Sequence, residues 1–221
     1  MVVTITIKDP SVKEVEAVQL WEGGPYWATT NIGAENPEDY GYYFWWGDTV
    51  GYKRENNKWV ASDGSNSNYN FSEGNTPTYN QSASSLKSKG WITADGVLTP
   101  EHDAAHVHWG DDWRMPTKEE IGDLVSVSKC TWTLTTNNGV AGFEVRGKGE
   151  YASNSIFLPM PGIAFDNQLQ LPGQTFVYWS STVEEDYGKY AWGLQYEPVN
   201  GNPYLSDKNY RWGGLPIRPV K

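Results

Sequence analysis

The sequence has one cysteine, few basic residues and no long hydrophobic run. With Cys130 as the single cysteine, no disulfide can form within the chain. The 17 basic and 27 acidic residues give a formal net charge of −10. Nucleic acids and anionic membranes select a basic surface, so we expect neither as a partner. No apolar run reaches membrane-spanning length, and we expect no membrane insertion. The opening residues, MVVTITIKDP, alternate like a strand and lack the basic start of a signal peptide.

Leu, Ile and Val are also sparse, whereas aromatic residues are plentiful. They make up 14% of the chain, with 12 Trp and 14 Tyr, beside 23 Gly and 13 Pro. This composition indicates short strands, many loops and a core built from flat aromatic rings. A length of 221 residues is ample for one core. We expect an N-terminal strand or linker segment, residues 1–16, followed by one domain, residues 17–221.

Local signals predict two helices in the middle of the chain. Thr117 and Glu120 form a T-x-x-E capping box, which predicts a helix from about Lys118 to about Val127. A shorter helix is expected to begin at Thr99 or Asp103. Short strands with turn signals such as Asn138-Gly139 follow, and residues 51–84 suggest a long irregular insertion. The pattern predicts an α+β fold with short strands, two main helices and long irregular loops.

Three histidines are the first candidates for chemistry. His102 and His106 stand four residues apart, so one helix face would present both, as a zinc pair requires, with His108 or Asp103 as a third ligand. The simpler interpretation is a solvated helix that carries histidines, and we favour it. We therefore expect no metal site and no cofactor.

Acidic pairs and the lone thiol are the remaining candidates for catalysis. Glu119-Glu120 suits the first turn of a capped helix, and Asp111-Asp112 suits a loop turn. Neither these pairs nor Glu184-Glu185-Asp186 show the fixed separation that a glycosidase needs. Cys130 fits a packed strand start. We therefore expect no catalytic residues and a protein that is not an enzyme.

Eight segments between about Gln19 and Val220 resemble one bacterial family when taken in order. They are WATTNIGAENPEDYGYYFWWGD, DAA followed by WGDDWRMPTKEE, CTWT, NGVAGFEV, SIFLPMPG, YWSST, YAWGL and GLPIRPV. In this order they resemble the Fibrobacter succinogenes major paralogous domain, a family related to the C-type-lectin-like and sulfatase-modifying-factor folds.

The resemblance implies a C-type-lectin-like fold in which the two ends of the domain meet in a sheet. We therefore expect Val18–Trp27 to lie beside Leu215–Val220. The resemblance does not imply either of two activities known for related folds. The cysteine chemistry of sulfatase-modifying enzymes has only Cys130 to draw on. The calcium loop of C-type lectins has no good match, because the EPVN stretch carries an extra residue.

The same fold carries the variable proteins of diversity-generating retroelements, in which the segment before the C-terminus is diversified. Here residues 178–212 hold six of the 14 Tyr, among Asn, Ser and Asp. Paratopes favour this mixture, because Tyr gives a large contact area at little entropic cost. The predicted ligand-binding residues, expected to form one exposed patch anchored by Tyr204 and Tyr210, are Tyr187, Lys189, Gln195, Asn200, Asn202, Tyr204, Asp207, Asn209, Tyr210 and Arg211.

Two functional hypotheses follow. The first is a receptor-like or adhesin-like module that binds a protein or glycan ligand on another cell or surface, with a C-terminal surface diversified by a retroelement. The alternative is a structural bacterial surface domain without a single dedicated ligand. Both place the protein outside the cell or on its surface, with a phage virion as the alternative location.

Overall fold

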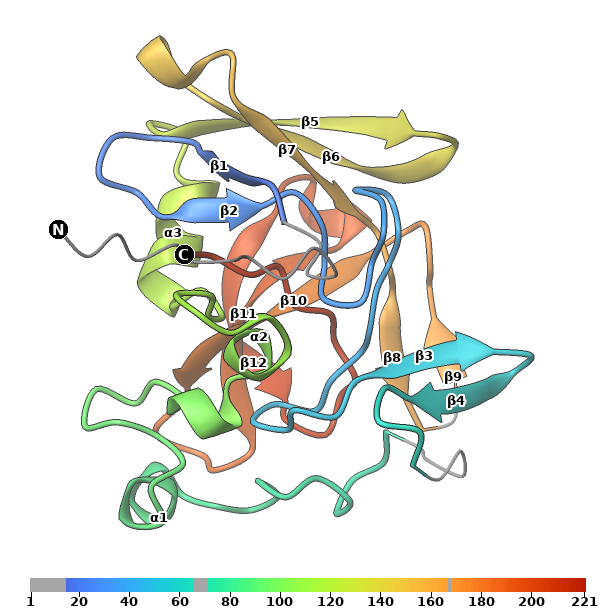
Figure 1. Cartoon of the computed structure of the whole chain (residues 1–221), viewed down its shortest axis with the longest axis vertical. Helices are drawn as coiled ribbons and strands as arrows, with labels where there is room; N and C mark the ends of the chain where they lie inside the picture. Colours follow the sequence, from blue (N-terminus) through green and yellow to red (C-terminus); the bar gives the residue numbers. More distant parts are fainter. Residues whose placement is uncertain (1–14, 66–70, 167) are drawn as a thin grey trace, which may run out of the picture.

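The computed structural model describes residues 15–65, 71–166 and 168–221, and β-strands dominate it (Figure 1). Strands take up 37% and helices 14% of the structure. The predicted α+β class is therefore wrong, and the arrangement of small antiparallel sheets does not show a C-type-lectin-like fold. The reason is length: the two expected helices have only six and eight residues. The Asn-, Gly- and Thr-rich segments around them pair as hairpins instead. The N-terminal segment, residues 1–16, falls almost entirely outside the described residues.

In the described part of the chain, twelve strands form five antiparallel sheets, ordered β1-β2, β3-β4, β5-β6-β7, β8-β9 and β10-β11-β12. The strands are β1 (Ala17–Gln19), β2 (Tyr26–Ala28), β3 (Tyr52–Glu55), β4 (Lys58–Ala61), β5 (Cys130–Asn137), β6 (Val140–Gly147), β7 (Ser155–Pro159), β8 (Ile163–Phe165), β9 (Gln168–Gln170), β10 (Phe176–Val183), β11 (Tyr190–Tyr196) and β12 (Tyr204–Tyr210). The helices are α1 (Ala83–Ser88), α2 (Ala104–Trp109), α3 (Lys118–Val125) and three short 3₁₀ helices, η1 (Pro100–His102), η2 (Gly149–Tyr151) and η3 (Pro198–Asn200).

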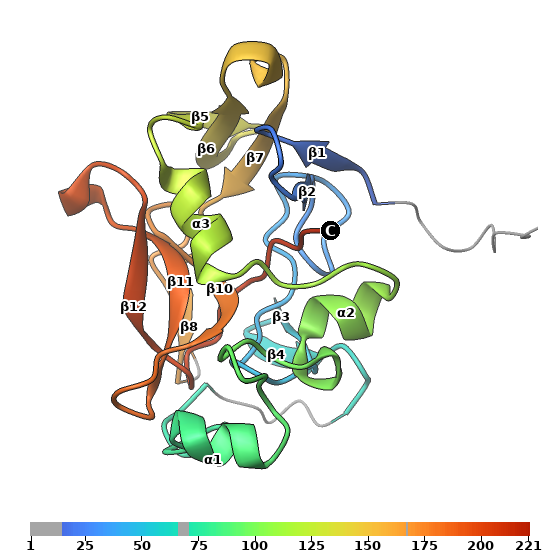
Figure 2. The ribbon, with the colours of Figure 1, turned by 90° about the vertical axis from the view of Figure 1, so that its left-hand side faces the viewer.

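The sheet β10-β11-β12 separates two hydrophobic cores. Because side chains alternate along a strand, Tyr178 on β10 enters a core shared with α3, β6 and β7, whereas Trp179 enters a second core shared with α1 and α2. Burial on both faces explains why every residue of β10 is buried. In Figure 2, α3 lies between the β10-β11-β12 sheet and the β5-β6-β7 sheet. Strand β12 is left at the outer edge, where its first four residues are half-buried and, of the last three, only Asn209 is buried.

The two ends of the domain lie side by side, as predicted. Trp27 forms a bridge with Val220, and the backbone N–H of Tyr26 donates to the carbonyl of Lys221 at 2.9 Å. The final segment differs from expectation in one respect. It is almost entirely buried but contributes only isolated bridges, because its prolines remove ladder donors.

Arg218 fixes this final segment from inside the protein. Its guanidinium donates to the side chain of Asn31 at 2.8 Å and to the carbonyls of Ala28 and Thr29. Burial lowers the pKa of Arg218 to about 10. The buried cation thus ties the C-terminal segment to the end of β2 and to the turn that follows it.

Residues 51–84 are not the irregular insertion that composition suggested. They contain the β3-β4 hairpin and a third core in which Trp59 and Phe71 are fully buried. The ring centroids of these two residues lie 5.0 Å apart, edge to face. Aromatic packing therefore replaces aliphatic periodicity as the ordering force here.

Two local predictions are confirmed. The Thr117 hydroxyl accepts from the N–H of Glu120, and the Glu120 carboxylate accepts from the N–H of Thr117, which completes the capping box of α3. Asn138 and Gly139, with φ of 47° and 83°, form the two-residue turn between β5 and β6. Among the described residues, no helix has the length and apolar character needed to cross a membrane.

Candidate ligand-binding surface

Three tyrosines meet at one end of the sheet, where β11 begins and β12 ends. Tyr190 pairs with Tyr210 across the two strands, and their ring centroids are 4.8 Å apart. Tyr187, in the loop before β11, places its ring 6.3 Å from that of Tyr190. Tyr187 is 72% exposed and Tyr210 is 39% exposed. We call Tyr187, Tyr190 and Tyr210 the tyrosine cluster.

Two further aromatic rings, those of Trp212 and Tyr79, support the tyrosine cluster from one side. The ring centroids of Trp212 and Tyr210 are 4.2 Å apart, and those of Tyr79 and Trp212 are 5.9 Å apart. Trp212 is buried, so it serves as backing and not as contact surface. The Tyr79 hydroxyl donates to the Glu73 carboxylate at 2.9 Å, which holds that ring in place. The exposed tyrosines therefore rest on fixed rings.

The loop that carries Tyr187 is held by a carboxylate. Glu184 follows β10 and is buried, and its two oxygens accept from the N–H groups of Asp186 at 2.9 Å and Tyr187 at 3.1 Å. Gly188 then turns the chain into β11 with φ of 66°, a conformation that other residues rarely adopt. The acidic run at 184–186 thus has a structural use, since Glu184 sets the position of an exposed aromatic ring.

Arg211 lies behind the tyrosine cluster and is 1% exposed. Its guanidinium donates to four backbone carbonyls, those of Tyr190 (2.9 Å), Gln81 (2.8 Å), Thr78 (3.4 Å) and Glu184 (3.3 Å). Burial lowers the pKa of Arg211 to about 10, although the nearby Glu184 raises it in part. The prediction that Arg211 is exposed for ligand contact is wrong. Its acceptors come from distant parts of the chain, and no local pattern shows them.

Asn209 was also predicted to be exposed and is buried. It sits at an irregularity in the pairing of β11 with β12, where Ala191 pairs with Asn209 but Gly193 pairs with Ser206. The extra residue on β12 leaves backbone groups to satisfy, and the Asn209 amide donates to the carbonyl of Ser206 at 3.1 Å. Asn209 therefore stabilises the bulge.

The other predicted residues do not join the tyrosine cluster. Tyr204 begins β12 and pairs with Gln195, so about 20 Å of strand separates it from Tyr210. Gln195 donates to Glu197, and Glu197 also accepts from Asn200 at 3.4 Å. Desolvation raises the pKa of Tyr204, with the Glu197 charge adding to the shift. The expected single patch is thus two groups at opposite ends of β12.

Charged residues lie near the tyrosine cluster in the chain. Lys189 is half-buried beside it, and Lys208 is exposed on β12, where Asp207 is half-buried. Asn202, in the turn before β12, is exposed at the far end. A hydrogen bond with Tyr210 raises the pKa of Tyr190, with burial the next cause, so the Tyr190 hydroxyl stays protonated at neutral pH. The cluster offers aromatic faces and hydroxyl groups.

Tyr190 is the member of the tyrosine cluster that the sequence pattern did not single out. Alternation along β11 puts Tyr190 on the same face as Leu194, which is in the core, so the pattern predicted a buried side chain for Tyr190. The structure shows that Tyr190 lies past the end of the covered part of the sheet, so the same face becomes partly open there. The cross-strand pairing with Tyr210 was the missing signal.

The histidines serve structural contacts. His102 stacks on Trp91 with ring centroids 3.8 Å apart, and a ring nitrogen of His108 lies 2.8 Å from the carbonyl of Thr49. His102 and His106 belong to different helices, η1 and α2, so they do not share one helix face. Asp103 is buried as the cap of α2. Within the described ranges, no three His, Cys, Asp or Glu residues are grouped as metal ligands.

The other candidates for chemistry also have structural roles. Glu120 completes the capping box and forms an ion pair with Arg114 at 2.5 Å. Cys130 is buried, which raises the pKa of its thiol to about 11 and keeps it protonated at neutral pH.

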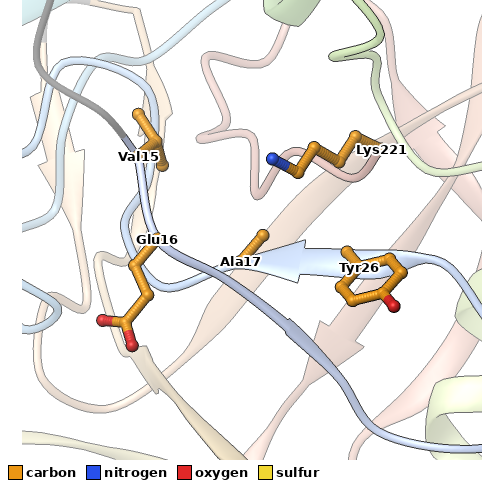
Figure 3. A pocket seen from close by; sticks show the side chains of 5 residues that line it. All are labelled: Val15, Glu16, Ala17, Tyr26 and Lys221. Atoms are coloured by element: carbon orange, nitrogen blue, oxygen red, sulfur yellow. The ribbon is translucent and has the colours of Figure 1, made fainter.

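A hollow of about 510 Å³ lies where the two ends of the domain meet (Figure 3). Glu16, Tyr26 and Lys221 supply its polar groups, beside Val15 and Ala17. Figure 3 shows the Glu16 carboxylate and the Lys221 ammonium pointing in different directions, so they do not converge on one point. The hollow therefore offers a weaker arrangement for recognition than the tyrosine cluster does.

No protein-family model, curated protein or solved structure matches this chain.

Proposed function

We propose that this protein is a non-enzymatic ligand-binding module that captures a protein or a glycan on another surface through the tyrosine cluster. The observation that carries the proposal is the contact of Tyr187, Tyr190 and Tyr210 on an exposed strand end. Tyrosine is enriched at binding hot spots because one ring supplies a large apolar area and a hydroxyl. The acidic net charge favours such a ligand over a nucleic acid.

Fixed positions of the rings support the same proposal. Ordering a loop on binding costs affinity, and a loop that is already ordered avoids this cost. The Glu184 carboxylate holds the Tyr187 loop, and Arg211 connects that loop to residues 78–81 and to β11. Two buried charged residues are thus used to position exposed aromatic rings.

The proposal includes a location outside the cell or on its surface, or on a phage virion, and relatedness to the Fibrobacter succinogenes major paralogous domain. It also includes diversification of the C-terminal segment by a retroelement. Such diversification would have to spare Asn209 and Arg211, because both are buried. The test is the neighbouring genomic sequence. A reverse transcriptase gene, together with a template repeat that differs from the coding sequence at the codons for Tyr187 and Tyr210 but not at the codon for Arg211, would support diversification. A template repeat that differs from the coding sequence at the Arg211 codon as well would contradict it.

Ligand capture is tested with two single variants at opposite ends of β12. Tyr210→Ala removes a member of the tyrosine cluster, whereas Tyr204→Ala removes a tyrosine about 20 Å away. Both proteins, with the wild type, are applied to a glycan array and to intact bacterial and eukaryotic cells. The proposal predicts loss of capture with Tyr210→Ala and retention with Tyr204→Ala. Loss with Tyr204→Ala alone would move the site to the other end of the strand. No capture by the wild type on any surface would favour a structural domain.

A further inference from the structure

Strand β5 is an edge strand without the protection that edge strands normally carry. It is the outer strand of the β5-β6-β7 sheet, and no other described strand pairs with its free side. All eight of its residues pair with β6 in one unbroken register. Its sequence, CTWTLTTN, contains no charge, proline or glycine. Natural proteins usually protect such edges with bulges, charges or proline, because an open edge can pair with another chain.

The edge of β12 shows the usual protection and serves as the comparison. Its pairing with β11 is interrupted by a bulge, and Asp207 and Lys208 lie at that point. The difference between the two edges is therefore a property of β5 and not of this fold in general.

The hydrogen-bond pattern shows which groups of β5 point outward. The carbonyl of Ala141, opposite Thr136, accepts from the N–H of Met160 on the far side of β6. In an antiparallel pair, the residue opposite such a position also turns its backbone groups away from its partner strand. Thr136, and by alternation Leu134 and Trp132, therefore direct their N–H and C=O groups toward the open edge. Cys130 shares this parity, but its N–H already donates to Ser126.

Side chains next to this edge leave apolar surface open. Leu134 is 60% exposed, one of the large apolar residues that the structure leaves uncovered. Trp132, two residues earlier on the same face, is half-buried, and its indole N–H donates to the carbonyl of Leu124 at 3.0 Å. The opposite face carries exposed Thr131, Thr133 and Thr135.

We propose that β5 is a self-association edge that pairs with β5 of a second copy of this chain, antiparallel and about a two-fold axis at Thr133. In this register, Trp132 of each copy lies opposite Leu134 of the other, and Thr131 lies opposite Thr135. In each of these pairs the two side chains lie on the same face of the joined sheet, because both residues are even-numbered or both are odd-numbered along the strand. Outward groups also meet outward groups. The N–H groups of Trp132, Leu134 and Thr136, which have no acceptor among the described residues, therefore find carbonyl acceptors in the second copy.

Charge also favours a second copy in this orientation. The turn of the β5-β6 hairpin holds Glu38, whose carboxylate accepts from the side chain of Asn137 at 3.1 Å. The base of β5 carries Lys129, which forms an ion pair with Asp123 at 2.6 Å. Two-fold pairing places the turn of one hairpin beside the base of the other, so Glu38 of each copy approaches Lys129 of the other. The strand itself is neutral, in a chain with a net charge of −10.

The pairing would join two tyrosine clusters in one particle. Bivalent attachment raises the apparent affinity for a surface when both sites can engage. Self-association is independent of what the tyrosine cluster binds, so either proposal can fail alone.

Sedimentation of the full chain over a range of concentrations tests the association. The proposal predicts a species of twice the 24.8 kDa chain mass, whose share rises with protein concentration. Thr133→Lys should abolish this species, because two lysines would face each other on the axis. The fold should persist, since Thr133 pairs with Glu144 on the same exposed face. Ser153→Lys, an equal charge change on an exposed loop, should leave the species unchanged.

Cysteine cross-linking tests the register. Native Cys130 is buried, so Thr133→Cys adds the accessible thiol. Under mild oxidation this variant should form a disulfide-linked dimer, whereas Thr131→Cys should not, because about 13 Å of strand separates the two copies of residue 131. Equal cross-linking of both variants would overturn the proposal. So would a wild type that stays monomeric at every concentration, or a dimer that disappears when residues 1–14 are deleted.

Discussion

Arg211→Met separates a residue that positions the site from one that contacts the ligand. Methionine keeps most of the apolar stem but removes the guanidinium, whose strongest hydrogen bonds are to the carbonyls of Gln81 and Tyr190 at 2.8 and 2.9 Å. It also removes the contact with the Trp46 ring, 5.1 Å from the guanidinium carbon. The carbonyl of Tyr190 keeps the N–H of Glu184 as a second donor. The carbonyls of Gln81 and Glu184 have no other hydrogen-bond donor among the described residues.

The expected loss follows from those two carbonyls. A buried acceptor left without its donor costs about 1–3 kcal/mol, and two of them cost about 2–6 kcal/mol. Relief from burying the cation, which lowers the pKa of Arg211 to about 10, offsets part of this. We expect a net loss of about 2–4 kcal/mol. For a chain of this size, that lowers the melting temperature by roughly 4–16 °C.

The assay is thermal and denaturant unfolding of Arg211→Met beside Lys208→Met. Lys208 is an exposed cation three residues earlier, so its replacement should change stability by less than about 0.5 kcal/mol. An Arg211→Met protein as stable as the Lys208→Met protein would refute the reasoning and return Arg211 to the exposed surface.

Three further predictions concern other parts of the fold. Thr117→Ala should cost about 0.5–2 kcal/mol in denaturant unfolding, because Glu120 loses the hydroxyl that accepts its N–H; an unchanged midpoint would contradict the capping box. In the wild type, burial raises the pKa of the Cys130 thiol to about 11, so the folded state holds the thiol proton more tightly than the unfolded state does. The stabilisation of the fold that results is complete below pH 9 and is lost as pH rises to about 11. Cys130→Val should therefore flatten the fall of stability between these values, and a slope equal to that of the wild type would count against it. Zinc should leave the melting temperature unchanged, since His102 stacks on Trp91 and His108 contacts a carbonyl; a zinc-dependent rise that His102→Ala abolishes would overturn this.

Features set by neighbouring residues could be predicted from the sequence. The capping box of α3 and the Asn-Gly turn of β5-β6 depend on side chains within four residues of each other, and both are confirmed. The proximity of Trp27 and Val220 followed from apolar segments at the two ends and from the family resemblance.

Features set by distant residues could not be predicted. Residues 204–210 were predicted to contribute an exposed patch, and no local signal indicated that they form β12, where β11 supplies the pairing and α3 covers Leu205. Arg211 is buried because carbonyls from three distant segments surround it. The fold class was wrong for the same reason: two recognisable helices drew attention, while the pairings of short strands across long separations left no local signal.

We propose that Tyr187 and Tyr210 bind ligand but contribute little to the stability of the fold. The direct measurement is the affinity of Tyr187→Ala/Tyr210→Ala for the captured ligand, immobilised on a biosensor, alongside its melting temperature. Tyr26→Ala is the matched control, because Tyr26 is 47% exposed and lies on β2, outside the tyrosine cluster. Loss of a hot-spot aromatic costs about 2 kcal/mol or more, so we predict at least a roughly 30-fold loss of affinity with little change in melting temperature. Tyr26→Ala should match the wild type in both. Unchanged affinity in the double variant, or a loss equal to that of Tyr26→Ala, would contradict the account.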